Sequence, residues 1–229
     1  IETVQPSLAS TALHQLAATA RILGEYDQSQ ALNERSVALN REVMGTASTL
    51  ASLWPRIASA LLSLNSGKVD EAEGRLQRVL ASLGDGNNYS NYRNSANIGM
   101  GLVALVRGDL ARGEALFVDA LDDPTNLYPY MRVQAWHGLA RIARLRQDDA
   151  RADELLRTAL HFAGHRSLLE EYIETVLEIA RQQPAGAPVN RLIDDLIDYI
   201  RPIHFTAAIA RLEAARDSAS SRRPQPTAA

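Results

Sequence analysis

The sequence contains no cysteine, which excludes disulfide bonds and zinc sites built on thiolates. It has no apolar run near the roughly 18 residues that a membrane-spanning helix needs, and no signal peptide is visible. A formal net charge of −3 and a pI near 6.0 leave no strong basic field to attract nucleic acid or anionic lipid. We therefore expect a cytoplasmic protein that binds neither nucleic acid nor membrane. Because the chain begins at Ile1 and not at Met, we also expect it to be part of a longer protein.

Aromatic residues are scarce, at 5% of the chain, whereas hydrophobic residues as a whole make up 46%. Alanine and leucine supply most of that fraction. Alanine has the best intrinsic helix propensity, and leucine loses little rotamer freedom in a helix. The β-branched and aromatic residues do not cluster in the alternating runs that predict strands. The composition therefore predicts an all-α fold.

A pattern of helix, polar corner and second helix recurs along the chain about every 40 residues. The corners centre on Gly24, Gly67, Gly108 and Gln147. Glycine adopts the left-handed conformation that ends a helix without steric cost. Gln147 carries a Cβ atom, so we expect slight strain at the fourth corner. The period indicates tandem pairs of antiparallel helices.

Compact residues recur at fixed distances from these corners: seven residues before, five after and twelve after. Small side chains at matched positions allow two helix backbones to approach closely, so these positions predict where the paired helices cross. The residues are Ala17, Ala60, Gly101, Ala140; Ser29, Ala72, Gly113, Ala152; Ser36, Val79, Ala120 and Ala159.

The residues of the third and fourth copies resemble the tetratricopeptide repeat (TPR) family. The matching positions are Gly101, Gly108, Phe117 and Ala120, with Pro124 near the closing proline, and Trp136, Leu139, Ala140, Ala152, Leu156 and Ala159. The period exceeds the usual length of about 34 residues, and alanine or serine replaces the family's large aromatic late in the first helix. The replaced positions are Ala20, Ser63, Ala104 and Ala143. Both departures are typical of the long-repeat variety in MalT-like and LuxR-type bacterial regulators. The resemblance covers about residues 7–165 and implies a right-handed α–α superhelix.

We predict one TPR-like domain over residues 1–217, with about five antiparallel helix pairs and a C-terminal capping helix. The predicted pairs are 7–44, 46–84, 90–124, 126–165 and a degenerate pair 167–201, followed by a cap at 206–217. Terminal repeats of a solenoid are usually atypical because one face meets water. The polar residues 218–229 are expected to be a disordered tail or linker.

Five stretches could carry chemistry, and each has a plainer interpretation that we favour. Residues 99–104 match a dinucleotide fingerprint, but they continue a helical run, so we expect helix packing. His161 and His165 are four residues apart without an evident third ligand, so we expect no metal site. Acidic residues at 170, 171 and 174, and at 194, 195 and 198, are expected on a solvated face. The Asn- and Tyr-rich stretch 85–94 could contact a ligand, although a loop and helix start is the simpler interpretation. We predict no cofactor and no catalytic residue.

In the resembled family the first helices line the concave surface, and this implies which side chains face a partner. The implied groove is apolar in its centre and basic at both ends. The predicted contact residues are His14, Arg21, Ile57, Leu61, Asn65, Leu102, Leu105, His137, Arg141 and Arg144. Arg141 and Arg144 could bind a carboxylate or phosphate bidentately. The alternative is that longer helices bury the Leu and Ile residues and leave no groove.

Three functions follow from these observations. The first is a sensor or interaction domain of a bacterial transcriptional regulator, with an NTPase module elsewhere in the protein, as the MalT-like resemblance implies. Its partner would be a protein or peptide segment or a small-molecule inducer. The sequence leaves open whether the chain also forms a homo-oligomer. The second is a stand-alone scaffold for assembling other proteins. The third, an enzyme with a hidden site, has the least support.

Overall fold

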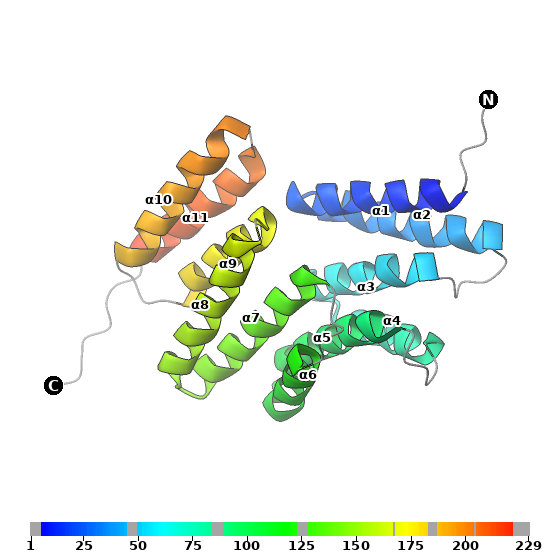
Figure 1. The fold of residues 1–229 in the computed structure, drawn as a ribbon, viewed down its shortest axis with the longest axis horizontal. Helices are drawn as coiled ribbons and strands as arrows, with labels where there is room; N and C mark the ends of the chain where they lie inside the picture. Colours follow the sequence, from blue (N-terminus) through cyan, green and yellow to red (C-terminus); the bar gives the residue numbers. More distant parts are fainter. Residues whose placement is uncertain are drawn as a thin grey trace. The chain divides into compact units, whose positions relative to one another are not determined.

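The computed structural model describes residues 6–44, 50–83, 89–122, 128–166, 168–182, 187–203 and 205–221. These ranges contain helices and no strand, which confirms the all-α prediction (Figure 1). None of the helices in these ranges is both long and apolar enough to span a bilayer.

The helices follow one another in the order that the repeat predicts (Figure 1). Helices joined by three-residue corners run antiparallel. The elements are α1 Pro6–Ile22, α2 Tyr26–Met44, α3 Leu50–Asn65, α4 Val69–Ser82, α5 Ser90–Val106, α6 Leu110–Asp122, α7 Pro129–Leu145, α8 Asp149–His165, α9 Leu169–Gln182, α10 Ala187–Ile200, a 3-10 turn Arg201–Ile203, and α11 Thr206–Ser221.

The chain divides into two compact units, Ile1–Gly138 and Leu139–Ala229, and the division falls within α7. In the first unit, each helix packs on its neighbours in sequence, and α3 also packs on α1 and α5. In the second unit, α9 packs on α8, α10 and α11. Contacts confined to neighbouring elements are typical of helical repeats. A single domain over residues 1–217 stays a prediction.

The four corners share one backbone geometry. The φ angles of Gly24, Gly67 and Gly108 are +80°, +76° and +79°, and that of Gln147 is +64°. The residue directly after each glycine or glutamine donates its backbone N–H to the carbonyl five positions back, as in Asp148 N to Ala143 O at 2.9 Å. Those carbonyls belong to Ala20, Ser63, Ala104 and Ala143. The prediction that a non-glycine residue adopts the left-handed conformation at the fourth corner is confirmed.

The compact residues predicted at the helix crossings are all buried, which confirms their packing role. Ser29 Oγ, for example, donates a 2.7 Å hydrogen bond to the carbonyl oxygen of Ala17 across the α1–α2 crossing. Side chains this small bring two helix backbones within hydrogen-bonding reach of each other.

The C-terminal boundary of the last helix was predicted four residues too early. Helix α11 continues to Ser221, so residues 218–221 are helical and not part of a disordered tail. Residues 218–221 are Ser-Ala-Ser-Ser, which contain no helix breaker, so the helix begun upstream continues through them. Residues 222–229 and Pro124 lie outside the described residues.

Candidate binding surface on the first helices

The apolar centre of the predicted groove is buried. The exposed fractions of Ile57, Leu61 and Leu102 are 0%, 7% and 9%, and that of His137 is 3%. Leu105 is half-buried. Side chains this inaccessible pack against neighbouring helices, so the prediction that Ile57, Leu102 and His137 face a partner is corrected. The alternative, that the long helices bury these residues, describes them better.

The predicted basic end of the groove is neutralised within the second unit. Arg141 donates from Nε and Nη2 to the two carboxylate oxygens of Glu178, each at 2.6 Å, and this hydrogen bonding raises the pKa of Arg141. Glu178 is only 2% exposed. Arg144 pairs with Asp149 at 2.6 Å and also with Asp153. Both guanidinium groups already hold carboxylates of the same unit, and their binding of a partner's anion stays a prediction.

Four of the predicted residues come together in the first unit. They line a pocket of about 90 Å³ with Trp54 and Tyr130, between α1, α2, α3 and the start of α7. Arg21 lies over the ring of Tyr130, with Cζ 4.8 Å from the ring centroid. The four residues are His14, Arg21, Leu61 and Asn65.

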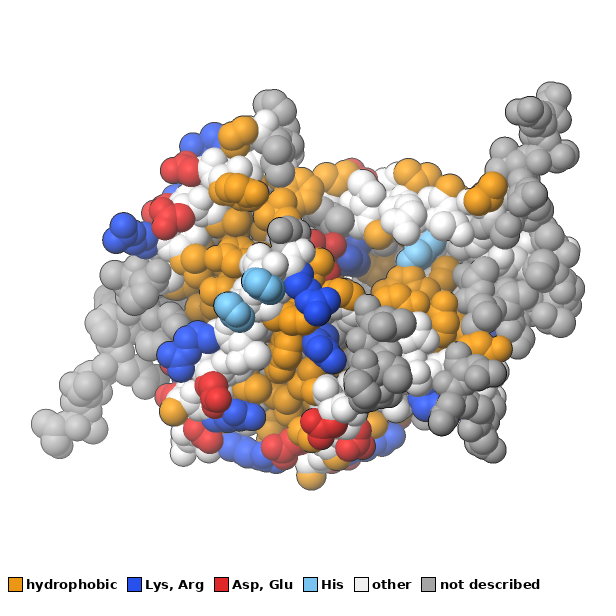
Figure 2. Space-filling view, viewed as in Figure 1, with side chains coloured by type: hydrophobic (Ala, Val, Ile, Leu, Met, Phe, Trp, Pro, Cys, Tyr) orange, Lys and Arg blue, Asp and Glu red, His pale blue; other side chains and the backbone are white. Residues whose placement is uncertain are grey.

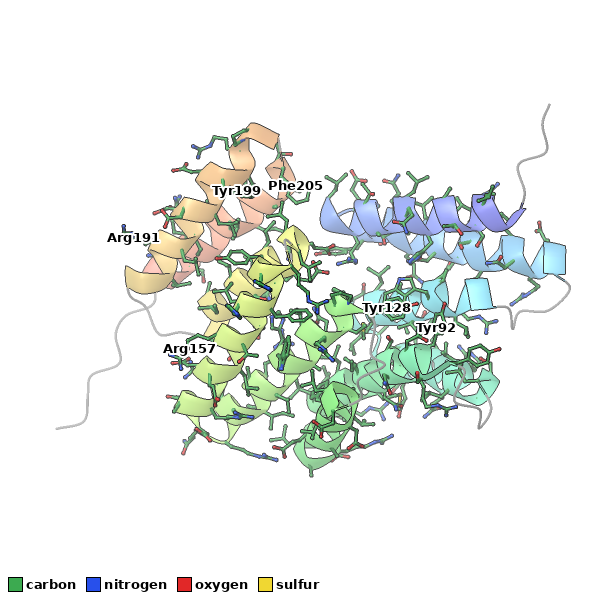
Figure 3. All side chains as sticks on the ribbon, viewed as in Figure 1. Tyr92, Tyr128, Arg157, Arg191, Tyr199 and Phe205 are labelled. Carbon is green, nitrogen blue, oxygen red and sulfur yellow. The ribbon has the colours of Figure 1, made fainter. Side chains whose placement is uncertain are left out.

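An aromatic cluster extends from this pocket across four first helices. The ring of Trp54 on α3 stacks on Tyr128, just before α7, with centroids 4.4 Å apart. Tyr92 on α5 lies 5.9 Å from Tyr128, and His14 on α1 meets Trp54 edge-on at 6.2 Å. All four side chains are half-buried. Figure 3 shows Tyr92 and Tyr128 beside α3, and Figure 2 shows hydrophobic side chains exposed over α3. We call His14, Trp54, Tyr92, Tyr128 and Tyr130 the aromatic surface.

Two titratable groups of the aromatic surface have shifted pKa values, each in the direction that favours the neutral form. Burial lowers the pKa of His14, and the charge of Arg21 lowers it further, whereas the 3.1 Å hydrogen bond that His14 Nδ1 donates to Asn33 Oδ1 raises it. Burial and a hydrogen bond with Tyr92 raise the pKa of Tyr128 well above its usual value. The imidazole of His14 and the hydroxyl of Tyr128 place hydrogen-bonding groups beside apolar rings. This arrangement suits the side chains and backbone of a peptide better than a small ion.

Sequence reasoning found part of this surface. His14 and Arg21 were predicted, and Tyr92 lies in the stretch 85–94 that was considered for ligand contact. Residues 84–88 lie outside the described part, and α5 begins at Ser90, as the simpler interpretation expects. Trp54, Tyr128 and Tyr130 were missed. Their signal was the position of scarce aromatic residues near the starts of successive first helices.

The remaining candidate stretches have structural roles. Gly99 and Gly101 lie within α5 against Leu76 and Phe117, which confirms the packing interpretation of residues 99–104. The rings of His161 and His165 stack with centroids 6.0 Å apart. The described residues contain no group of three or more potential metal ligands.

The two acidic stretches differ from each other in exposure. Asp194, Asp195 and Asp198 are exposed, as predicted. The residues at 170, 171 and 174 are only half-buried, so the prediction of a solvated face is wrong for them. Glu174 forms an ion pair with Arg211 at 2.7 Å. Helix α9 packs on both α8 and α11, so its acidic side chains have little free surface around them.

Comparison with known proteins shows the fold but no family. No family model matches the sequence, and no curated protein matches it. Among solved structures, the Rap conjugation gene regulator of plasmid pLS20, solved in complex with a peptide, matches with a TM-score of 0.67 and 11% identity over 96% of this chain. This chain spans 65% of the length of that regulator. BtubC (BKLC) from P. vanneervenii matches with a TM-score of 0.53 and 16% identity, over 73% of this chain and 68% of the other. The chain therefore has a TPR-like helical repeat fold.

Proposed function

We propose that this chain is a non-catalytic repeat domain that binds an extended peptide segment through the aromatic surface. The observation that carries this proposal is the convergence of half-exposed rings from four successive first helices beside Arg21. Aromatic side chains dominate binding energetics because they bury a large area with few rotatable bonds. The peptide in the structure of the Rap regulator supports the same type of ligand for this fold.

The surface also defines the chemistry of the peptide. The stacked pair Trp54–Tyr128 favours an aromatic or large aliphatic side chain, since ring edges and faces attract one another at these distances. Arg21 lies at the pocket margin and favours a carboxylate or backbone carbonyl nearby. We therefore expect a peptide with one large apolar anchor next to an acidic or carbonyl-rich position.

Within a longer protein, this domain would be the sensor or interaction region of a bacterial signalling regulator, and the peptide would belong to a partner or to a neighbouring domain. The MalT-like resemblance supports this context, including an NTPase module outside this chain. A small-molecule inducer would use the same aromatic surface. A stand-alone scaffold is the alternative, and it requires a second binding surface that acts at the same time as the first.

Panning a random peptide library against the purified chain tests the proposal. We expect enriched peptides to share an aromatic or large aliphatic anchor. In a Trp136→Phe background Trp54 is the only tryptophan, so its fluorescence reports binding at the aromatic surface directly. Truncation of an aromatic anchor often costs 2 kcal/mol or more, so Tyr128→Ala should weaken binding by about thirtyfold.

Tyr199→Ala is the matched control, because Tyr199 is 72% exposed on α10 and belongs to the second unit. Its affinity for the selected peptides should equal that of the unaltered chain. The proposal is wrong if the peptides bind Tyr128→Ala as tightly as Tyr199→Ala, with both variants shown to be folded by circular dichroism.

A further inference from the structure

A second pocket in the first unit is lined by basic side chains from α2, α3 and α4. Its volume is about 330 Å³, at the lower end of the roughly 300–1,000 Å³ typical of small-ligand sites. Four arginines and one glutamate supply its charged groups, which leaves a local excess of positive charge in a chain whose net charge is −3. The lining residues are Glu34, Val37, Arg41, Arg56, Ser59, Arg75 and Arg78. We call this the arginine pocket.

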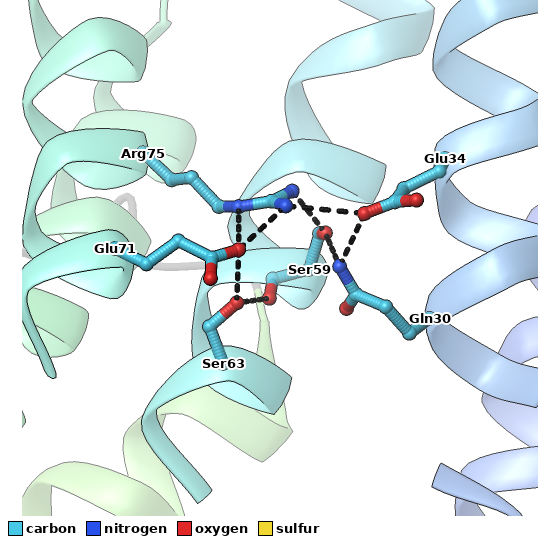
Figure 4. A network of polar contacts seen from close by, with 6 residues as sticks. All are labelled: Gln30, Glu34, Ser59, Ser63, Glu71 and Arg75. Atoms are coloured by element: carbon cyan, nitrogen blue, oxygen red, sulfur yellow. Dashed lines mark hydrogen bonds and ion pairs between the residues drawn. The ribbon is translucent and has the colours of Figure 1, made fainter. Parts of the chain in front are cut away.

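One of the four arginines is fixed by a hydrogen-bond network (Figure 4). Arg75 donates to Ser59 Oγ at 2.7 Å, to Glu71 Oε1 at 2.9 Å and to Glu34 Oε1 at 3.1 Å. Gln30 donates to Glu34 at 2.6 Å and to Ser59 at 2.8 Å, so the same glutamate is held from a second side. The network ties α2, α3 and α4 together and gives the pocket a defined wall.

The other three arginines have no such compensation. Among the described residues, no carboxylate lies within ion-pairing distance of Arg41, Arg56 or Arg78. Burial lowers the pKa of Arg56, and the positive charges of Arg41 and Arg78 lower it further. Three guanidinium groups that repel one another across a pocket are stabilised when an anion enters between them.

We infer that the arginine pocket binds a phosphate monoester carried by a small molecule. A carboxylate is planar and is satisfied by one guanidinium fork, whereas a phosphate dianion accepts hydrogen bonds from several directions at once. The cations come from three different helices and therefore approach a ligand in the pocket from several directions. The volume leaves room for a short organic group beside the phosphate. This site does not depend on peptide binding at the aromatic surface.

Calorimetric titration of the full chain with phenyl phosphate and with inorganic phosphate tests the inference at constant ionic strength. We expect both to bind, with acetate and chloride failing to compete. Arg56→Met should weaken binding about tenfold or more, because each lost charge-assisted hydrogen bond costs roughly 1.5–3 kcal/mol. Glu34→Gln should tighten binding, since it removes the one carboxylate in the lining.

Arg151→Met is the matched control, because Arg151 is an exposed arginine of α8 that pairs only locally with Glu154. It should bind phenyl phosphate like the unaltered chain. Equal affinity of Arg56→Met and Arg151→Met would overturn the inference, as would equal competition by acetate. A phosphoserine peptide that binds while phenyl phosphate does not would overturn the assignment to a small molecule. Because binding is measured directly, a loss of thermal stability in Arg56→Met is recognised separately by its unfolding curve.

Discussion

The two units bury different kinds of groups between helices of the same type. In the first unit the fully buried ring of Phe117 lies against two glycines, Gly101 and Gly138. In the second unit the side chain of Glu178, 2% exposed, lies among Arg141, Arg181 and Gln182. The first arrangement depends on the volume available to a ring. The second depends on compensation of a buried charge.

A related difference separates two sets of arginines, one in each unit. In the second unit, Arg141 and Arg144 are paired with carboxylates of the same unit. In the first unit, the described residues provide no carboxylate partner for Arg41, Arg56 and Arg78. Arginine content alone therefore does not identify a binding site. What matters is whether the fold supplies the counter-charge, and that decides between a structural and a ligand-binding role.

Removing the cation from the second unit should have the largest effect. Arg141→Ala removes two hydrogen bonds from the buried Glu178, which keeps contacts with Arg181 at 3.1 Å and Gln182 at 2.6 Å. Breaking a buried ion pair typically costs about 3–5 kcal/mol of stability. Because Glu178 keeps other partners, we expect Arg141→Ala to lower the free energy of unfolding by about 3 kcal/mol, the lower end of that range. Urea denaturation followed by circular dichroism measures the change in the free energy of unfolding.

Two further variants sharpen that test. The double variant Arg141→Met with Glu178→Leu should recover most of the loss, because well-packed apolar residues replace a buried pair at little cost. Arg151→Ala, which removes an exposed pair, should change stability by less than about 0.5 kcal/mol. If Arg141→Ala were as mild as Arg151→Ala, charge compensation would not hold the second unit together.

Adding volume to the first unit should have the next largest effect. A methyl group at Gly138 would overlap the Phe117 ring, and one at Gly101 would lie 2.6 Å from Cε1 of the same ring. Overpacking costs about 1–3 kcal/mol, so we expect Gly138→Ala to lose about 2 kcal/mol although alanine is the better helix former. Chemical denaturation again measures the loss.

A glycine without such a neighbour provides the control. A methyl group at Gly74 on α4 would meet only the flexible end of Arg78, at 3.5 Å, so Gly74→Ala should gain up to about 1 kcal/mol from helix propensity. Adding Phe117→Leu to Gly138→Ala should restore part of the lost stability, because leucine is smaller than the phenylalanine ring and leaves room for the added methyl group. Equal effects of Gly74→Ala and Gly138→Ala would contradict a first unit limited by ring volume.

The sequence predicts local features of this fold and misses its long-range ones. The corners and the compact crossing residues were predicted because they depend on backbone sterics and side-chain size at fixed spacing. The contacts of Arg141 were not, because Glu178 lies 37 residues away on another helix. The aromatic surface was found only in part, because it joins residues of four helices whose rotation about their axes the sequence does not specify. For the same reason Ile57 and Leu102 were assigned to a groove although they are buried.

The corner of the second unit offers the smallest and most specific test. The first unit turns at Gly24, Gly67 and Gly108, whereas the second turns at Gln147 with φ at +64°. A left-handed conformation costs a residue with a Cβ atom about 1–2 kcal/mol, partly offset in a Gln147→Gly variant by the greater freedom of glycine in the unfolded chain. Gln147→Gly should therefore stabilise the chain by about 1 kcal/mol, and the reciprocal Gly67→Gln should destabilise it by about as much. A Cβ at Gly67 would meet nothing within 4 Å, so only backbone conformation distinguishes the two exchanges. If both substitutions changed stability in the same direction, something other than the left-handed backbone would control these corners.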